Sequence, residues 1–546
     1  MKKLWAGILA LALSISLALP ASAAGFTDIP PGSALASEVE KANSYGLMGG
    51  YTAFTFGYAD SMTRAQFVTV LVRMMHWEGS TAHGVTEAMA LPNGLSDTYR
   101  AMIDIAAGCD VVDANAAFRP NDAITRGEMS EMLVRALGLK GAASIAEKQS
   151  SLPFTDVTEG RGYIAVAYQI GMTTGTSSTT FAPNATATRA QAAAMLVRIY
   201  EKLQKKTDCT HAFYAISSYS QLTLAEGMSR VSVGWSRMTW DGSAALLSTT
   251  SADGNEYAIP SGYQDVTAAL GGTPLNLSVF MDDSGGVKEL LASETGRKQA
   301  IEQILNELTV SYRAIGENPY DGVTIDFEGL RAAQKADFTA FLTELTLQVK
   351  ALGKLVYVCV SPVLTTGSYY DGYDYRAIGQ LADKVILMAY DYDTRDLSAY
   401  IGTEYYKTAA PSPIDQAYAS LLAITDANTG VADSSKILLG ISCKNVAWQI
   451  DSNGKLVSGM PVYPSAETVH QRLAQSDTVK GRSSTYQMPY ATYTADGNTY
   501  FLWYEDDLSA AAKLNAAKLL GITGVSVWRL GIIPDYSDFA LMPGLK

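Results

Sequence analysis

The sequence predicts a multidomain protein in which a small α-helical bundle precedes an α/β barrel of the (β/α)8, or TIM, type. Two observations carry this prediction. A short motif recurs three times in the first part of the chain, and eight β-rich runs alternate with helical stretches in the second part. The length of 546 residues suits several domains, and 48% hydrophobic residues suffice for more than one packed core.

The charge balance disfavours two classes of partner. The chain has 41 Lys and Arg against 54 Asp and Glu, a net charge of −13. A nucleic-acid-binding protein needs a basic surface to neutralise phosphates, and docking on anionic lipid needs the same. We therefore expect neither nucleic acid nor a membrane surface as a partner.

Residues 1–23 have the features of a secretory signal peptide. Two lysines precede an apolar run from Leu4 to Leu19, and a small-residue cleavage site ends at Ala23. The alternative is a membrane anchor, but the run is shorter than the roughly 20 residues that span a bilayer. We expect a secreted chain with no membrane span after cleavage.

The recurring motif is Thr-Arg followed by Ala or Gly and then by Gln or Glu. Its arginines are Arg64, Arg126 and Arg189, which are 62 and 63 residues apart. The Thr suits a helix N-cap, the Gln or Glu completes a capping box, and an apolar stripe with helical spacing follows. Each unit is a helix–loop–helix too small to bury its own apolar face, so we expect three units in one pseudo-threefold bundle.

These repeats resemble S-layer homology domains. The three units cover residues 26–76, 95–140 and 152–203. The resemblance implies binding to a cell-wall polysaccharide and an S-layer or cell-wall location, with Arg64, Arg126 and Arg189 holding an acidic sugar substituent. A guanidinium group at a helix N-terminus is a suitable anion site. The alternative is that each arginine pairs with a neighbouring carboxylate, as surface arginines commonly do.

The second part of the chain has the pattern of a barrel. Residues 204–210 are polar and aperiodic, which indicates a linker, and 211–546 remain for the second domain. The β-rich runs are Ala212–Ser217, Arg230–Trp235, Leu275–Phe280, Gly322–Phe327, Lys354–Ser361, Lys384–Tyr390, Lys436–Ser442 and Gly524–Trp528. The helical stretches include Gly296–Leu308, Ala332–Leu352, Gln416–Thr425 and Leu508–Leu520. This alternation predicts a closed parallel barrel. Residues 443–507 lack a clear helix, and we expect an insertion that forms part of a cleft wall.

Acidic side chains gather at the end of the strand Gly322–Phe327, and TIM barrels hold their active sites at strand C-termini. The period of two places Thr324, Asp326 and Glu328 on one face and apolar residues on the other. Two carboxylates on one face raise the pKa of one of them, which keeps a general acid protonated near neutral pH. The alternative is a structural ion pair with a basic residue.

Two further strand ends carry aromatic residues, Tyr390 followed by Asp391, and Trp528. A Tyr hydroxyl and a Trp face suit a sugar ring, although core packing would explain either one alone. Taken in order, the Asp-Gly-x-x-x-Asp-x-Glu strand, the Met-x-Tyr-Asp strand and the terminal Trp resemble glycoside hydrolase family 18. The likeness is to the branch of spore-cortex and cell-wall N-acetylglucosaminidases.

The resemblance implies a glycosidase of the chitinase or N-acetylglucosaminidase type. Such enzymes cleave β-linked N-acetylhexosamine chains, as in peptidoglycan or chitin, with retention, and the acetamide oxygen of the substrate attacks the anomeric carbon. By this resemblance Glu328 is the general acid and then the base. Asp326 orients the acetamide group, and Tyr390 hydrogen-bonds it. Trp528 forms an apolar floor under the sugar, and Asp391 supports the site.

Thr324 departs from the family pattern, which has Asp or Asn at this position. A threonine can tune Asp326 only weakly, through one hydrogen bond. The leading hypothesis is an exported, wall-anchored glycosidase. The alternative that Thr324 supports is a non-catalytic, lectin-like wall protein with a family 18-like barrel. A third reading is a purely structural S-layer component, in which the strand-end motifs would be idle.

No cofactor and no metal site is expected. The one Cys/His cluster, Cys209-Thr-His211, lacks the second pair that a zinc site needs. The acidic run after Tyr390 has Arg395 at a calcium-ligand position and lacks the required Gly. Four widely spaced cysteines do not make a disulfide framework, and Cys359 is most simply a small buried hydrophobe.

Overall fold

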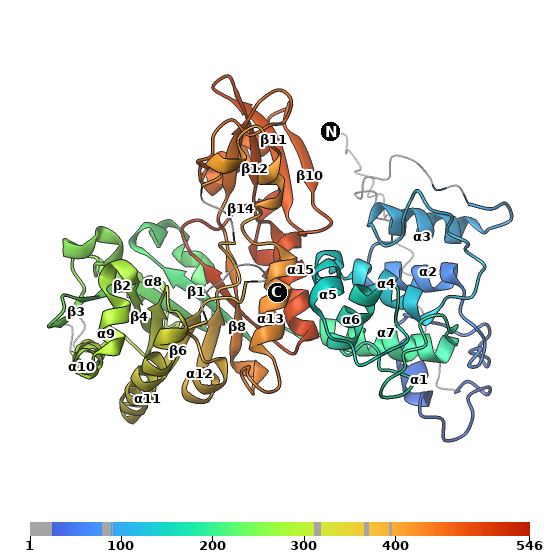
Figure 1. Cartoon of the computed structure of the whole chain (residues 1–546), viewed down its shortest axis with the longest axis horizontal. Coiled ribbons are helices and arrows are strands. Elements are labelled where there is room, and N and C mark those ends of the chain that lie inside the picture. Colours follow the sequence, from blue (N-terminus) through green and yellow to red (C-terminus); the bar gives the residue numbers. More distant parts are fainter. Residues whose placement is uncertain are drawn as a thin grey trace, which may run out of the picture.

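A computed structural model of the chain describes residues 25–78, 89, 91–310, 318–364, 371–392 and 396–545. It contains a helical bundle, a barrel beside it, and an insertion that rises above both (Figure 1). The multidomain architecture that the sequence predicts is confirmed. The signal segment 1–23 and Arg395 lie outside the described residues.

Seven helices of the described residues form the bundle. They are α1 (Ala36–Ser44), α2 (Arg64–Met74), α3 (Asp97–Gly108), α4 (Arg126–Ala136), α5 (Lys140–Gln149), α6 (Arg161–Gln169) and α7 (Arg189–Leu203). Helices α2, α4 and α7 begin at the repeat arginines. Their N-caps, Thr63, Thr125 and Thr188, each form a capping box with the Gln or Glu three residues later, as predicted. Helix α5 is not predicted, because it lies between two copies of the repeat.

Backbone bridges close the three units into a ring. They join Ser61 to Thr188, Thr63 to Ala123 and Thr125 to Thr186. Each unit therefore pairs with the other two through the segment that precedes its repeat helix. The result is the pseudo-threefold bundle that the sequence predicts, since the same contact recurs around the ring.

Eight parallel strands form the barrel. They are β1 (Cys209–Tyr214), β2 (Arg230–Trp240), β4 (Leu275–Met281), β5 (Gly322–Phe327), β6 (Leu355–Val360), β7 (Lys384–Leu387), β8 (Ile437–Ser442) and β13 (Gly524–Trp528). Neighbouring strands follow chain order, and β1 pairs with both β2 and β13, which closes the sheet. The predicted barrel is confirmed. The first strand begins at Cys209 instead of Ala212 because its pairing with β13 starts there, so the linker is shorter than predicted.

Helices cover the outside of the barrel. The predicted stretches appear as α10 (Glu294–Thr309), α11 (Lys335–Ala351), α13 (Ile414–Ile424) and α15 (Asp507–Leu519). The short helices α8 (Tyr263–Ala269), α9 (Val287–Ala292) and α12 (Tyr375–Leu381) are not predicted. Six or seven residues are too few to display a helical period. A further strand, β3 (Ala245–Ser248), pairs antiparallel with the C-terminal part of β2 and forms a hairpin with it.

The insertion follows the seventh barrel strand, as predicted. Its antiparallel sheet consists of β10 (Val479–Arg482), β11 (Pro489–Ala495), β12 (Asn498–Trp503) and β9 (Val446–Ile450), in this order. The sequence-based expectation that it has no helix is wrong, because α14 (Ala466–Leu473) packs against it. Only Val469 and Leu473 of α14 are buried, so its apolar pattern is too sparse to recognise. Two short strands, β14 (Asp535–Tyr536) and β15 (Phe539–Ala540), follow the barrel.

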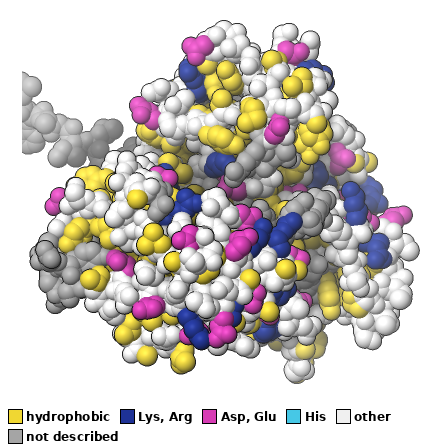
Figure 2. Space-filling model, turned by 60° about the vertical axis from the view of Figure 1, so that its left-hand side comes forward, with side chains coloured by type: hydrophobic (Ala, Val, Ile, Leu, Met, Phe, Trp, Pro, Cys, Tyr) yellow, Lys and Arg dark blue, Asp and Glu magenta, His cyan; other side chains and the backbone are white. Residues whose placement is uncertain are grey.

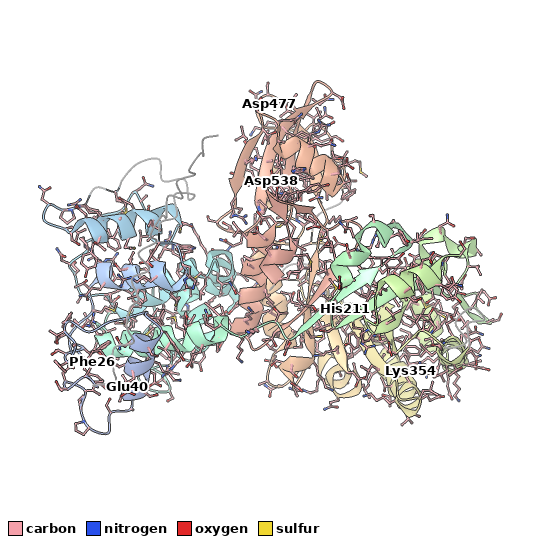
Figure 3. All side chains as sticks on the ribbon, turned by 180° about the vertical axis from the view of Figure 1, so that it is seen from behind. Phe26, Glu40, His211, Lys354, Asp477 and Asp538 are labelled. Atoms are coloured by element: carbon pink, nitrogen blue, oxygen red, sulfur yellow. The ribbon has the colours of Figure 1, made fainter. Side chains whose placement is uncertain are left out.

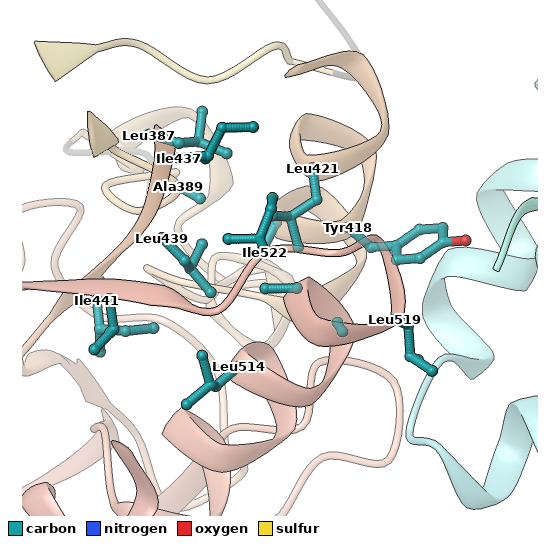
Figure 4. Packing of buried hydrophobic residues seen from close by; sticks show 14 of the residues in the cluster. Leu387, Ala389, Tyr418, Leu421, Ile437, Leu439, Ile441, Leu514, Leu519 and Ile522 are labelled. Atoms are coloured by element: carbon teal, nitrogen blue, oxygen red, sulfur yellow. The ribbon is translucent and has the colours of Figure 1, made fainter. Parts of the chain in front are cut away.

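The bundle packs directly on the barrel, with α5 against α13 and α7 against α15. Tyr418 reaches from the barrel core toward the bundle (Figure 4), and its hydroxyl donates to Oε1 of Gln169 at 3.2 Å. The Lys202 ammonium group donates to the carbonyls of Ile170 and Leu519, at the C-terminal ends of α6 and α15. One ammonium group thus binds the C-terminal carbonyl groups of a helix on each side of the seam, the interface between the bundle and the barrel.

A buried ion pair fixes the end of the insertion to the barrel. Glu505 and Lys513 are each 1% exposed, and Nζ of Lys513 lies 2.7 and 2.8 Å from the two carboxylate oxygens. Burial raises the pKa of Glu505, while Lys513 opposes that shift. Each charge depends on the other, because neither has access to water.

Replacing Lys513 by Met is expected to lower the free energy of unfolding by about 3–5 kcal/mol, because the Glu505 charge would remain buried without its partner. The double variant E505Q/K513M should recover most of this loss, since both charges are gone. Urea unfolding of the full chain, followed by circular dichroism, measures both effects. A double variant as unstable as K513M would show that the loss has a cause other than the uncompensated charge.

Candidate active site

The strand β5 presents its acidic residues to the inside of the barrel. Thr324 bonds to side chains of other strands in the interior, whereas Phe327 stacks outward on Phe341 of α11 with ring centroids 5.3 Å apart. Val323 and Ile325 are fully buried in the same outer core. The predicted division into a polar inner face and an apolar outer face is confirmed.

A cavity of about 330 Å³ opens at the C-terminal ends of the strands. It is lined by Phe213, Tyr214, Ala215, Ser217, Gly234, Ser236, Glu256, Tyr257, Ser278, Phe280, Asp326, Glu328, Trp528 and Arg529. Three residues singled out in the sequence, Asp326, Glu328 and Trp528, therefore share one cavity. Glu328 and Trp528 are half-buried, so both can meet a ligand. The Trp528 ring packs edge-on against the Phe213 ring, with the two ring centroids 5.1 Å apart.

Asp326 is the most unusual group in this cavity. It is 3% exposed, and its Oδ1 has no hydrogen-bond partner among the described residues. Burial raises its pKa to about 6, and a hydrogen bond from the Cys359 thiol opposes the shift. Cys359 is fully buried, as expected, but its contact with Asp326 is not predicted, because the apolar run around it gives no sign of a polar neighbour.

Thr324 belongs to a polar network in the floor of the barrel instead of contacting Asp326. Its hydroxyl lies 2.7 Å from Oγ of Ser232 and accepts from Nδ2 of Asn276 at 3.0 Å. Ser232 in turn contacts His211, which reaches Ser526 on the last strand. His211 lies in the middle of the barrel (Figure 3), and burial lowers its pKa to about 3, so the imidazole is neutral. The expected hydrogen bond from Thr324 to Asp326 is absent from the described residues.

Tyr390 and Asp391 lie beside the cavity and do not line it. Burial raises the pKa of Tyr390 well above its ordinary value, so the hydroxyl remains a donor. Gly440 makes room for the Tyr390 ring, since an added Cβ would come within 2.8 Å of it. Asp391 adopts a left-handed backbone (φ 61°) and pairs with Lys444 at 3.3 Å.

Another wall of the cavity is not predicted from the sequence. Tyr257 stacks on Phe280 with a centroid distance of 5.5 Å, and the Arg237 guanidinium lies over both rings. Arg237 also pairs with Asp282 at 3.0 Å. Of these residues only Phe280 lies in a predicted element, the β-rich run Leu275–Phe280. The pairing of β2 with β4 places Arg237 opposite Phe280, and Tyr257 comes from the short 3-10 helix η3 (Asn255–Tyr257).

The three repeat arginines join neighbouring units of the bundle. Nε of Arg64 donates to the carbonyl of Phe118, that of Arg126 to Phe181, and that of Arg189 to Phe56. Each guanidinium also lies within 5 Å of the centroid of the same phenylalanine ring. Each arginine thus holds the aromatic loop of the next unit around the ring.

The charge environment of these arginines differs. Arg64 pairs with Glu128, which Arg119 also contacts at 3.0 Å. For Arg64 the carboxylate-pairing alternative therefore applies. Arg126 donates to the carbonyl of Thr174, and Arg189 to that of Gly49. No ion pair with a carboxylate is found for these two within the described ranges.

Other features of the described residues add no further site. They contain no group of three or more His, Cys, Asp or Glu that could hold a metal ion, and all four cysteines are thiols. None of their helices is long and apolar enough to cross a bilayer. On the face in Figure 2, acidic and basic side chains are interspersed, and hydrophobic side chains gather on the upper lobe, which is the insertion.

Residues 201–532 match the family described as Glycosyl hydrolases family 18. The chain belongs to this family. Residues 25–68 and 153–193 match the S-layer homology domain, which corresponds to the first and third units of the bundle. The family 18 match covers the barrel and its insertion, so the cavity at the end of β5 lies within it.

Individual proteins are similar to parts of this chain. The cortical fragment-lytic enzyme of Bacillus subtilis is 26% identical over 273 residues, 49% of this chain and 58% of that protein. A surface layer protein of Brevibacillus choshinensis is 31% identical over 142 residues, 25% of this chain and 13% of that protein. The crystal structure of the Bacillus cereus spore cortex-lytic enzyme SleL aligns over 60% of this chain and 72% of that one, with 18% identity and a TM-score of 0.47. The chain spans just over half the length of the cortical fragment-lytic enzyme.

Replacing Asp326 by Asn is expected to stabilise the protein above pH 6. Because burial raises the folded-state pKa, the wild type loses stability as pH rises from about 4 to about 6, and the neutral Asn lacks this loss. The gain should level off near 2–3 kcal/mol, as expected for a shift of about two units. Thermal unfolding of both proteins between pH 4 and 8 measures it. If the difference in stability between the two proteins does not grow with pH, the raised pKa of Asp326 is contradicted.

Proposed function

We propose that this protein is a cell-wall-anchored glycoside hydrolase that cleaves β-linked N-acetylhexosamine glycan with retention. The observation that carries the proposal is the cavity that unites Glu328, Asp326 and Trp528 at the end of β5. The bundle holds the chain on the wall, which raises the local concentration of enzyme at its substrate. The protein is secreted and acts at the cell surface.

Glu328 is the general acid and base of the proposed reaction. It is half-buried and lines the cavity, so a glycosidic oxygen can reach it. Its carboxyl group protonates the leaving oxygen, and the carboxylate then takes a proton from the attacking water. The acetamide oxygen of the substrate is the nucleophile, so the reaction needs no second enzymatic carboxylate in that role, unlike most retaining glycosidases.

Asp326 orients the acetamide group. Its Oδ1 lacks a partner among the described residues, and an acetamide N–H would supply one. The ionised carboxylate also stabilises the positive charge of the oxazolinium intermediate. Tyr390 lies beside the cavity, and because burial raises its pKa, its hydroxyl is the proposed donor to an acetamide oxygen that reaches it. Trp528 forms the apolar floor, and Asp391 contributes through its ion pair with Lys444.

A lectin-like protein is the second candidate. The observation in its favour is that Thr324 bonds to Ser232 and Asn276, so it cannot share a proton with Asp326 as an Asp would. Cys359 contacts Asp326 from the next strand and provides one donor in its place. We therefore favour an active enzyme.

The variant Glu328→Gln is expected to abolish the release of reducing ends from N-acetylglucosamine oligosaccharides and from peptidoglycan, with a loss of at least about 10³-fold. An amide cannot protonate the leaving oxygen. Glu302→Gln, which changes an exposed carboxylate on α10 outside the cavity lining, is the matched control and should retain most activity. A wild type that binds these glycans without cleaving them would favour the lectin.

For the bundle, we propose that Arg126 binds the acidic substituent of a wall polysaccharide, and that Arg64, which pairs with Glu128, and Arg189, which is only 6% exposed, do so less well. Glu128 already compensates the charge of Arg64 and would repel an anion. Within the described ranges no carboxylate lies at ion-pair distance from Arg126, and the charge of Asp156 acts on it only from farther away. The ring of Tyr51, which lies beside Arg189 and is 52% exposed, adds a face that suits a sugar.

The variants Arg126→Gln and Arg64→Gln are expected to differ in wall binding. Loss of a charge-assisted contact should weaken retention by Arg126→Gln about tenfold or more, and by Arg64→Gln less. Retention is measured by co-sedimentation with purified cell walls. The walls are used before and after an acid treatment that removes the acidic wall polysaccharide. Thermal unfolding monitors the bundle, because both arginines also hold loops. Equal retention of R126Q and wild type contradicts the proposed role of Arg126.

A further inference from the structure

Arg529 is a cation in the wall of the active-site cavity. It follows Trp528 at the end of β13 and lines the cavity with Asp326 and Glu328. Its Nη1 donates to Oγ of Ser217 at 3.0 Å and to Oγ of Ser218 at 3.2 Å. The same nitrogen donates to the carbonyl of Leu530 at 3.2 Å. All of these acceptors are neutral.

No ion pair joins Arg529 to an acidic side chain within the described ranges. Burial alone lowers the pKa of Arg529, with no contribution from a nearby carboxylate. The other cation of the cleft differs in this respect, because Arg237 pairs with Asp282 at 3.0 Å. A half-buried guanidinium that lacks a counter-charge is costly, and a bound anion would compensate it.

The surroundings hold the guanidinium in place. Ser218 is fully buried, accepts from the backbone of Ala215 and donates to the Leu530 carbonyl. Oε1 of Gln221 accepts from the backbone N–H groups of Gly531 and Ile533. These contacts tie the segment after Trp528 to the 3-10 helix η1 (Ile216–Ala225). They engage only Nη1, so Nε and Nη2 make no hydrogen bond to the described residues.

We propose that Arg529 binds a free carboxylate carried by the substituent of a sugar in the cleft, so that an acidic N-acetylhexosamine polymer is preferred over chitin. This inference rests on the proposed hydrolytic function. Two parallel N–H groups of a guanidinium match a carboxylate in a bidentate arrangement. Chitin offers only hydroxyl and acetamide groups. Peptidoglycan carries a lactyl ether on alternate sugars, and its carboxyl group is free where the peptide stem has been removed.

This chemistry also places the reaction in a sequence. While the stem is attached, the lactyl carboxyl is an amide and has no charge for Arg529 to bind. Hydrolysis of that amide by an amidase-type reaction would therefore supply the preferred substrate. The product would be a shorter glycan that still carries its carboxylates.

The test compares three glycans of similar length: stem-free peptidoglycan strands, the same strands with their carboxyl groups converted to methylamides, and chitooligosaccharides. The ratio of kcat/KM for the acidic strands to kcat/KM for the methylamides is the readout. Wild type should favour the acidic strands, and Arg529→Gln should reduce the ratio about tenfold to a hundredfold. Arg529→Lys should give an intermediate ratio, because lysine keeps the positive charge but lacks the two parallel N–H groups. Arg198→Gln, an exposed arginine on α7, is the charge-matched control.

Two results would overturn the inference. One is a wild-type enzyme that cuts acidic strands and methylamides equally well, and the other is an Arg529→Gln variant with the wild-type ratio. In either case cleavage of chitooligosaccharides would leave the hydrolytic function standing. If no glycan is cut, that function fails, and calorimetric affinities of wild type and Arg529→Gln for the acidic and methylamide strands still decide the role of Arg529.

Discussion

When β1 pairs with β2 on one side and with β13 on the other, the sheet closes and all eight strand C-termini meet at one rim. Residues from both ends of the barrel sequence, Phe213 and Trp528, then share a cavity with Asp326 from its middle. Closure also removes the inner face from water. Polar side chains there must bond one another or remain without a partner, and the barrel contains both cases.

The floor of the barrel and the mouth of the cavity show these two outcomes. In the floor, Thr324, Ser232 and His211 satisfy one another, so this layer is structural in character. One layer higher, Asp326 keeps an oxygen without a partner, and burial raises its pKa. A buried acceptor of this kind costs stability in the free protein and is available to a ligand. This contrast supports the proposal that the reaction takes place above the floor.

In the bundle, side-chain contacts hold the three repeat units together. Its repeat arginines each hold an aromatic loop of the neighbouring unit, so one residue type joins all three units of the ring. The seam with the barrel adds a further constraint, because Lys202 binds helix ends on both sides. The bundle and the barrel are thus held together by contacts at both helix ends.

The sequence by itself determined the repeats, the eight strands, the acidic face of β5 and the order of the motifs, because these depend on local periodicity and on residue type. It did not reveal α14, whose apolar stripe is too sparse, or the shorter linker, whose end depends on strand pairing. Only the tertiary structure decided that Cys359 contacts Asp326, that Thr324 does not, and that Glu128 pairs with Arg64. These contacts join segments far apart in the chain, and strand register and helix packing bring them together.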